Sequence, residues 1–277
     1  MNRLLLCTDL DRTLIPNGSQ PESPGARDIF SRLMEMEGVT LAYVSGRHRA
    51  LIRQAMREYD LPKPAFVIAD VGSTIYRVVE GEWQHWQLWD GEISTDWKGL
   101  SRAALHELFS GISLLQLQEQ EKQNTHKLSY YFPPGQDHQA VMAEMEKRLR
   151  ERGIRANLIW SIDEIQHVGL LDVLPASASK LHAISFLMRQ CGYDGEHTIF
   201  AGDSGNDLDV LLSPIHAVLV ANADDEVRSA VTGASPNNLY VAQGDFLNMN
   251  GNYSAGILEG VAHFRPEFIP LMEGLQQ

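Results

Sequence analysis

Short apolar runs alternate with amphipathic segments through the first eighty residues of the chain. Apolar runs at 3–7, 39–44, 65–69 and 74–79 are typical of strands buried on both faces. The intervening segments 24–37 and 50–59 carry apolar residues at roughly helical spacing. Strands that alternate with helices in this way predict an α/β domain with a doubly wound parallel sheet.

The same alternation resumes from Ser177. We expect strands at 198–201, 216–220 and 238–241, with helices at 180–190, around Leu212, at 225–231 and at 257–264. The two ends of the chain therefore predict one discontinuous, doubly wound parallel-sheet (Rossmann-like) core, made from residues 1–80 and 175–277.

The segment 81–174 has a different character and holds all five tryptophans. It predicts helices at 97–109 and 139–152, and strands at 113–117, 127–132, 154–161 and 168–174. We expect an inserted α+β domain here, which we call the cap domain. A domain placed over the carboxyl ends of the core strands would act as a lid that excludes water and reads the substrate.

Composition and charge narrow the choice of partners. The chain has 277 residues, 44% apolar and 21% charged, and a formal net charge of −13. This charge argues against nucleic acid or an anionic membrane as a partner, since both attract basic surfaces. An anionic small-molecule substrate would need local cations and a metal to draw it in.

The two cysteines, Cys7 and Cys191, fall in a predicted core strand and near a predicted helix end, which argues against a disulfide framework. Asp9 and Asp11 stand where a secretory signal would need its apolar stretch, and no apolar run is long enough to span a bilayer. We therefore expect a soluble, cytoplasmic protein that acts as a monomer or weak homodimer.

Two carboxylates, Asp9 and Asp11, follow the first predicted strand directly. In an open parallel sheet, reactive groups collect beyond the carboxyl ends of the strands. Two acids this close repel each other, so they need a cation or a shared proton, and Mg²⁺ suits an all-oxygen site. Alone, the pattern also fits an Asp-rich turn in which Thr13 starts a helix.

Three further motifs follow in order, and each has a structural alternative. Ser45-Gly46-Arg47 follows the second strand and could bind an anion at a helix N-terminus, or Ser45 could be only a helix cap and Arg47 a structural ion-pair partner. Lys180 starts a helix, where a lysine is usually solvated. The loop 202–207, Gly-Asp-Ser-Gly-Asn-Asp, reads as a metal loop or as a plain turn.

The four motifs together resemble those of the haloacid-dehalogenase superfamily of aspartate-dependent phosphohydrolases with a C2-type cap. The segments 127–131 and 255–260 are similar to its sucrose-phosphatase-like branch. This resemblance implies that Asp9 is the nucleophile of an aspartyl-phosphate mechanism and Asp11 the general acid. It also implies roles for other residues: phosphate binding by Ser45, Gly46, Lys180 and Asn206, and Mg²⁺ binding by Asp9, the Asp11 carbonyl, Asp203 and Asp207, the last directly or through water.

The resemblance further implies a disaccharide phosphate as substrate, such as sucrose 6-phosphate. Alternatives are another glycosyl phosphate (mannosylfructose phosphate or a glycosyl-glycerate phosphate), a phosphomutase, and a non-catalytic sugar-phosphate-binding protein. Thr74 stands where sucrose phosphatases tend to have an acid. Candidate substrate contacts are Arg47, Asn124, His126, Lys127 and Tyr130, although the alternation in 127–131 would also suit a half-buried strand with one solvated face.

Overall fold

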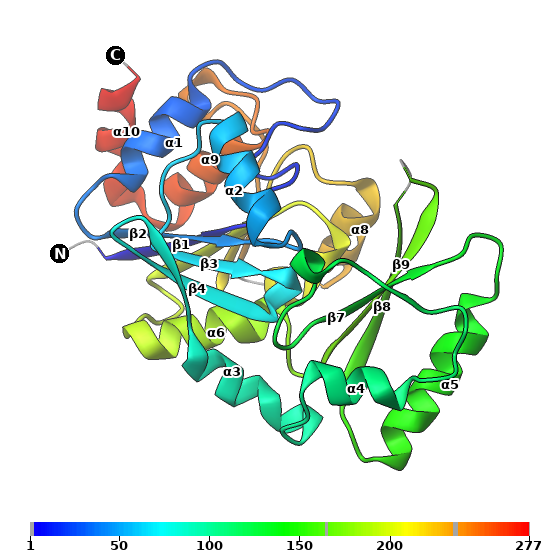
Figure 1. Ribbon diagram of the computed structural model, residues 1–277. Coiled ribbons are helices and arrows are strands. Elements are labelled where there is room, and N and C mark those ends of the chain that lie inside the picture. The colour runs from blue at the N-terminus through cyan, green and yellow to red at the C-terminus, as the bar shows by residue number, and fades with distance from the viewer. Residues whose placement is uncertain (1–2, 164–165, 235–237, 277) are drawn as a thin grey trace.

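An eight-stranded sheet with the order β12-β11-β10-β1-β2-β3-β4-β5 organises the larger part of the protein (Figure 1). The structure, a computed structural model, describes residues 3–163, 166–234 and 238–276. Neighbouring strands from β12 to β3 pair in parallel, and β4 and β5 extend the sheet antiparallel. The strands are β1 (Leu4–Thr8), β2 (Val39–Val44), β3 (Phe66–Ala69), β4 (Thr74–Val79), β5 (Glu82–His85), β10 (Thr198–Gly202), β11 (His216–Leu219) and β12 (Leu239–Val241).

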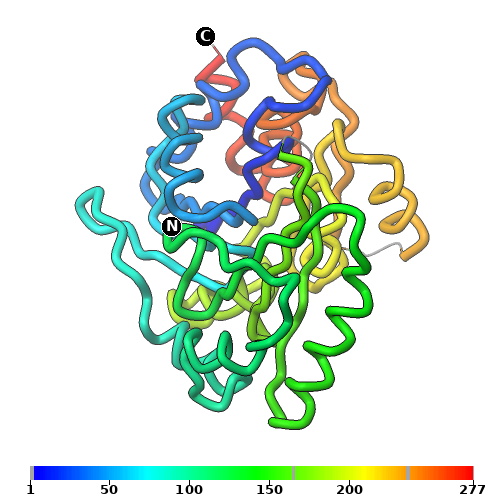
Figure 2. The backbone as a smooth tube through the Cα atoms, turned by 45° about the vertical axis from the view of Figure 1, so that its right-hand side comes forward, coloured from blue at the N-terminus to red at the C-terminus, as the bar shows by residue number. Residues whose placement is uncertain are grey.

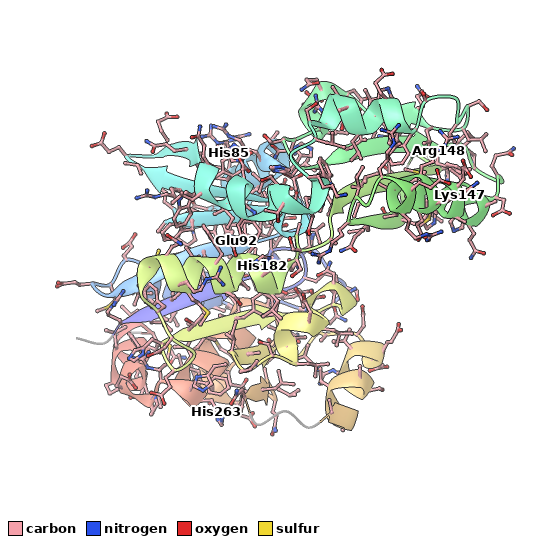
Figure 3. The ribbon with its side chains drawn as sticks, turned by 90° about the horizontal axis from the view of Figure 1, so that it is seen from below. His85, Glu92, Lys147, Arg148, His182 and His263 are labelled. Atoms are coloured by element: carbon pink, nitrogen blue, oxygen red, sulfur yellow. The ribbon has the colours of Figure 1, made fainter. Side chains whose placement is uncertain are left out.

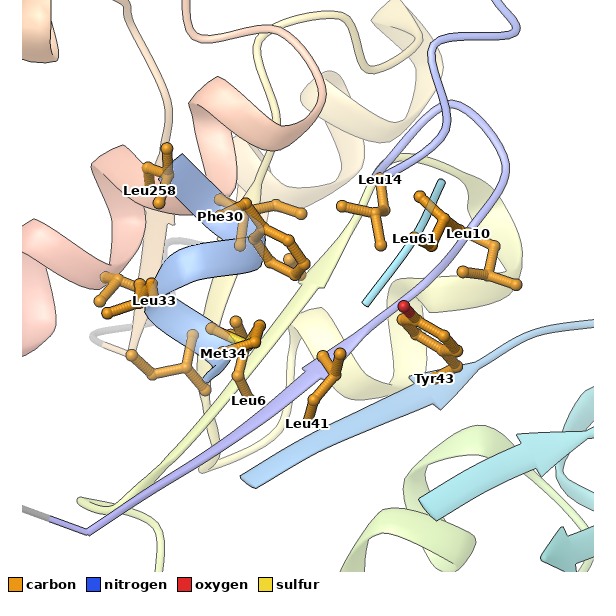
Figure 4. Packing of buried hydrophobic residues seen from close by; sticks show 14 of the residues in the cluster. Leu6, Leu10, Leu14, Phe30, Leu33, Met34, Leu41, Tyr43, Leu61 and Leu258 are labelled. Atoms are coloured by element: carbon orange, nitrogen blue, oxygen red, sulfur yellow. The ribbon is translucent and has the colours of Figure 1, made fainter. Parts of the chain in front are cut away.

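Helices cover both faces of this sheet. Alternate residues of the central strand β1 point to opposite sides, so each face of the strand packs against its own layer of helices. Leu6 of β1 packs with Phe30, Leu33 and Leu258 on one face (Figure 4), while Cys7 belongs to the core cluster of the other face. The first face carries α1 (Ala26–Met34), α2 (Arg49–Glu58), α9 (Ser254–Phe264) and α10 (Ile269–Leu275). The second carries α3 (Gln87–Ile93), α6 (Lys180–Cys191), α7 (Leu208–Leu211) and α8 (Asp225–Ala234).

This arrangement confirms the predicted α/β class with a doubly wound, mostly parallel sheet. Every residue of β1 and β10 is buried, as expected for strands with helices on both sides. None of the helices in the described residues is long and apolar enough to cross a membrane.

A second, four-stranded antiparallel sheet forms the cap domain, in the order β6-β7-β9-β8. Its strands are β6 (Gln116–Leu117), β7 (Leu128–Phe132), β8 (Ala156–Asp163) and β9 (Val168–Pro175), and its helices α4 (Arg102–Leu108) and α5 (His138–Glu151) pack on one face. In Figure 2 this green part of the chain lies toward the viewer, in front of the larger sheet. Trp97 and Tyr130 lie fully buried between sheet and helices.

The segment that joins the two sheets differs from the sequence-based expectation. Strand β5 continues the large sheet beyond Glu80, and Trp89 and Ile93 of α3 belong to a core cluster of the large sheet. Helix α3 is also tied to α6, since Glu92 accepts a 2.7 Å hydrogen bond from His182 (Figure 3). The division at residues 80/81 remains a prediction, and from these contacts we propose that the cap domain begins after Ile93.

One predicted helix is also shorter than expected. Helix α4 begins at Arg102 rather than at Trp97, because Lys98 (φ 53°) and Gly99 (φ 73°) take left-handed conformations that end the short 3₁₀ turn Ser94–Trp97.

Helix α9 lies so close to β11 that glycine is required at position 260. A Cβ atom there would lie 2.1 Å from Cγ2 of Val218. We expect Gly260→Ala to lower the free energy of unfolding by about 1–3 kcal/mol through overpacking. Gly91→Ala, at an exposed position of α3 with nothing within 4 Å of the new atom, serves as the control and should be neutral or slightly stabilising. Urea denaturation measures both, and equal effects would contradict the close packing of α9.

Candidate active site

Four loops meet at the carboxyl edge of the central strands. Asp9 follows β1, Ser45 follows β2 and Asp203 follows β10, and β1 lies between the other two strands. The main-chain amide of Asp9 donates to the carbonyl of Ala201 at 2.9 Å, so the loops start side by side. The predicted motifs therefore lie together at one edge of the sheet.

Lys180, the first residue of α6, binds two of these loops through its ammonium group, the loop after β1 and the loop after β10. Its Nζ lies 2.8 Å from Asp9 Oδ1, 2.7 Å from Asp207 Oδ1 and 2.7 Å from Asn206 Oδ1. The three protons of an ammonium thus each have an acceptor. Burial disfavours the charge, but the two carboxylates outweigh it and hold the pKa of Lys180 above its ordinary value. This lysine is charged and fixed, not a solvated surface residue.

Three buried carboxylates surround this cation. Oxygens of Asp9, Asp203 and Asp207 lie within 4.8 Å of one another, the one such group of three among the described residues. Burial, opposed by Lys180 and reinforced by the other two acids, raises the pKa of Asp9 to about 7. Burial and Asp207 raise the pKa of Asp203 to about 6, although Thr13 and Arg12 oppose the rise. The protein alone therefore leaves more negative charge here than Lys180 balances.

The three acids differ in how many hydrogen bonds their carboxylate oxygens accept. Oδ2 of Asp203 is buried and makes no hydrogen bond within the described part of the chain, while its Oδ1 accepts one from Thr13 at 3.1 Å. Both oxygens of Asp207 are engaged: Oδ1 by Lys180, and Oδ2 by the amides of Asp203 and Ser204, each at 3.2 Å. A divalent cation with oxygen ligands fits this donor set, with Asp9 and Asp203 as the available carboxylates.

Asp207 is thus placed to orient Lys180 and to hold the loop. Its side chain lies against the main chain at position 202, where a Cβ atom would come within 2.6 Å of Oδ2. Glycine at 202 is therefore required for this contact. The loop also closes as a capping box, in which Ser204 and Asp207 bond each other's main chain.

Asp11 lies outside the buried group and pairs with Arg47. Arg47 Nε donates to Asp11 Oδ2 at 2.8 Å and Nη2 to Oδ1 at 2.5 Å, and Asn17 donates to Oδ1 at 2.7 Å. The Asp11 side chain is 40% exposed. The sequence left two roles open for Arg47, a structural ion pair with an acid and a place in the site. The structure shows both, because Arg47 pairs with Asp11 and also lines the cavity of the site. Both side chains line a cavity of about 360 Å³, together with Asp9, Arg12, Gly46, Leu51, Asp203, Ser204 and Asn206.

Ser45 is buried, and its hydroxyl accepts a hydrogen bond from the amide of Arg47 at 3.1 Å. It is not the cap of the next helix, because α2 begins at Arg49 with His48 in the capping position. Phosphate binding by Ser45 and Gly46 remains a prediction that this placement allows.

The sequence reasoning missed Arg12. Its guanidinium bonds Asp224 at 2.6 and 3.2 Å, and its Nε lies 3.5 Å from Asp203 Oδ2. Arg12 therefore places positive charge beside the Asp203 oxygen that accepts no hydrogen bond. The available signal was a basic side chain directly after the two acids of the first motif.

The structure places the four cap candidates in different surroundings. Asn124 and Lys127 contact Asp70, a core residue. His126 lies 3.5 Å from Asp90 and packs against Trp97. Tyr130 is fully buried in the hydrophobic cluster of the cap domain, and its role as a substrate contact stays a prediction. Its hydroxyl bonds His106 at 2.8 Å.

Comparison with known proteins agrees with these motifs. Residues 2–265 match the family of sucrose-6F-phosphate phosphohydrolases. A protein of Nitrosococcus oceani named only as a HAD-like hydrolase is 54% identical over 98% of this chain and 74% of its own. Sucrose-phosphatase 1 of Nicotiana tabacum is 28% identical over 95% of this chain, which spans only 59% of that relative's length. Mannosylfructose-phosphate phosphatase of Agrobacterium fabrum is 26% identical, covering 94% of this chain and 96% of its own.

Two solved structures are similar to this protein in fold, and one of them is a sucrose-phosphatase. The sucrose-phosphatase of Synechocystis sp., in complex with sucrose and phosphate, aligns with a TM-score of 0.69 and 28% identity over 95% of this chain and 98% of its own. A haloacid dehalogenase-like hydrolase of Bacillus subtilis aligns at 0.65 with 20% identity, covering 94% of this chain and 92% of its own, which supports the fold alone.

The buried ion-pair network generates a stability prediction. Lys180→Met should leave Asp9 and Asp207 without their cation, at a cost of about 3–5 kcal/mol in the free energy of unfolding near pH 8. Since the pKa of Asp9 is already raised to about 7, lowering the pH protonates this acid and should shrink the loss. Denaturation of metal-free protein at pH 5 and pH 8 measures this.

Lys147→Met, on the exposed side of α5 (Figure 3), is the control and should change stability by less than about 0.5 kcal/mol. A deficit of Lys180→Met that is the same at both pH values would mean that lost packing, not charge, is the cause.

Proposed function

The chain belongs to the sucrose-6F-phosphate phosphohydrolase family, and we propose that it is a Mg²⁺-dependent sugar phosphatase that works through an aspartyl-phosphate. The observation that carries this proposal is that Asp9, which lines the cavity together with Arg47 and Asp203, contacts the buried cation Lys180 behind it. A nucleophilic carboxylate, two cations for phosphoryl oxygens and a free acidic oxygen for a metal are what phosphate-ester cleavage requires.

In the first step a carboxylate oxygen of Asp9 attacks phosphorus, and the ester bond to the sugar oxygen breaks. Asp11 donates a proton to the leaving alcohol oxygen. In the second step Asp11 takes a proton from water, the water oxygen attacks phosphorus, and the bond to Asp9 breaks to release phosphate. Bound Mg²⁺ would orient the phosphoryl group and offset its charge. Asp9 and Asp203 would hold it with the Asp11 carbonyl, and Asp207 would support it indirectly.

Arg47 would bind the phosphate and would also determine when Asp11 is free to act as the acid. It is bonded to Asp11 through two of its nitrogens, and an incoming phosphate offers it a more highly charged partner. Transfer of Arg47 to the phosphate would free the Asp11 carboxyl to serve as the acid. Ser45, Gly46 and Asn206 would supply further hydrogen bonds to the phosphate.

The proposed substrate class is a disaccharide phosphate such as sucrose 6-phosphate. It is supported by similarity to a sucrose-phosphatase over nearly the whole chain. A second candidate is another glycosyl phosphate, and similarity to a mannosylfructose-phosphate phosphatase favours it. Thr74 bears on this choice less than the sequence suggests, because its side chain is buried and its hydroxyl already bonds Asn124.

A panel of sugar phosphates with Mg²⁺ present tests the proposal. We expect release of phosphate, fastest from one disaccharide or glycosyl phosphate. Isomerised sugar phosphate without free phosphate would indicate a phosphomutase instead. Binding without any turnover would indicate a non-catalytic sugar-phosphate-binding protein.

Removal of the nucleophile gives a specific prediction. Asp9→Asn keeps the shape of the side chain and should reduce phosphate release by more than about a thousandfold, with the fold intact by circular dichroism. Asp11→Asn should be severely impaired on sugar phosphates but less so on p-nitrophenyl phosphate, whose leaving group needs no proton. Near-normal turnover by Asp9→Asn would end the aspartate mechanism.

Metal binding should depend on pH in a defined direction. The pKa values of about 7 for Asp9 and about 6 for Asp203 mean that protons compete with Mg²⁺ at these oxygens below neutral pH. The rise in melting temperature caused by Mg²⁺, measured against excess chelator, should therefore be larger at pH 8 than at pH 5.5.

Asp203→Asn should abolish this rise, whereas Asp194→Asn, at an exposed acid that pairs with His197 and does not line the site, should retain it. Full activity of the wild-type protein in excess chelator would contradict a metal requirement.

A further inference from the structure

Asp70 is a buried carboxylate outside the acidic group, and its charge is satisfied mainly by the cap domain. It begins the short turn η1 (Asp70–Gly72) after β3 and is 1% exposed. Asn124 donates to its Oδ2 at 3.0 Å, and Lys127 Nζ lies 3.4 Å from its Oδ1. Thr74 adds a 3.3 Å hydrogen bond from the core side. Lys127 also lies 3.4 Å from Asp172 on β9, so its ammonium joins the two domains.

The same turn contacts the phosphate-binding motif through its main chain. The amide of Asp70 donates to the carbonyl of Arg47 at 3.1 Å, and the amide of Val71 donates to the carbonyl of Ser45 at 3.2 Å. A shift of the turn would therefore move the main chain from Ser45 to Arg47.

On its other side the turn packs against the start of α6. A Cβ atom at Gly72 would lie 2.3 Å from the carbonyl oxygen of Ser179 and 2.9 Å from the amide nitrogen of Lys180. Glycine is required here because the main chain of the turn touches the main chain that carries Lys180. The position of Lys180 thus depends on the position of Gly72.

The backbone of the turn is in a conformation that needs outside support. Asp70, Val71 and Gly72 have φ angles of 53°, 56° and 92°. For residues other than glycine this left-handed region costs about 1–3 kcal/mol each, and it persists only where the surroundings fix it. The bonds from Asn124 and Lys127 to the Asp70 carboxylate supply that support from the cap domain.

We propose that Asp70 is a positioning residue through which the docked cap domain holds both Lys180 and the Ser45–Arg47 turn in place for phosphate transfer. This inference rests on the proposed phosphatase function. It assigns Asn124 and Lys127 to the positioning of the core site and not to the recognition of sugar hydroxyls. Catalysis should then depend on the Asp70 contacts even for a substrate that carries no sugar.

Kinetics on two substrates test this assignment. Lys127→Met and Asn124→Ala should each lower kcat on both a sugar phosphate and p-nitrophenyl phosphate, by about tenfold or more, because small displacements of catalytic groups are costly. KM should change much less. A rise in KM for the sugar phosphate alone would overturn the proposal, because it would show that these side chains read the sugar. Unchanged kinetics on both substrates would overturn it too.

Lys122→Met is the matched control. Lys122 is another cap lysine, and its ammonium pairs with two residues of the cap domain itself, Tyr131 at 2.6 Å and Glu119 at 3.4 Å. This variant should keep wild-type kcat on both substrates. A loss equal to that of Lys127→Met would mean that general weakening of the cap domain explains the effect, and the assignment to Asp70 would fail.

Hydrogen exchange supplies a readout that does not need activity. In the chain of 277 residues, Lys127→Met and the near-isosteric Asp70→Asn should speed amide exchange in the turn 70–73 and at His182 and Ala183, whose amides bond Ser179. Exchange in the strands of the large sheet should stay as in the wild type. Unchanged exchange at the start of α6 would refute the coupling. If the wild-type protein hydrolyses no phosphate ester, the proposed function fails, and exchange still decides this inference.

Discussion

The contact between Lys180 and two buried carboxylates is the constraint on which the site depends. Asp9, Asp207 and Lys180 come from three loops, and each would be costly to bury without the others. The network therefore fixes the ends of β1 and β10 relative to the start of α6. The same network leaves an acidic surplus at Asp203, which makes the site receptive to a divalent cation. Stability and chemistry thus rest on one group of charges.

The sequence predicted the core well because its signals are local. Each motif directly follows an apolar run, and a parallel sheet brings the ends of such runs to one edge, so Asp9, Ser45 and Asp203 could be placed together without knowledge of the fold. Glycine at 202 and Asp207 belong to the same local pattern. The doubly wound class followed from the alternation of strands and helices alone.

The remaining features depend on tertiary contacts that no local pattern encodes. The pairing of Arg47 with Asp11, the contact of Arg12 with Asp224 and the position of Tyr130 inside the cap cluster join residues far apart in sequence. Strand β5 was missed because it is short and its pattern continues only after the tight turn at Glu80 and Gly81. The alternation of residues in β7 correctly predicted a strand. It did not predict which face of that strand would pack against the hydrophobic cluster of the cap domain.

The order of the strands also constrains how the chain acquires this site during synthesis. Strand β1 is made before its neighbour β10, which leaves the ribosome only after the whole cap domain, and Asp9 meets Lys180 across 171 residues. Until then β1 has one unpaired edge and its acids lack their cation. Contacts of such long sequence separation make folding slow and leave partly folded chains open to association. The nascent chain before β10 is therefore the stage at which the unpaired edge of β1 is open to pairing with other chains.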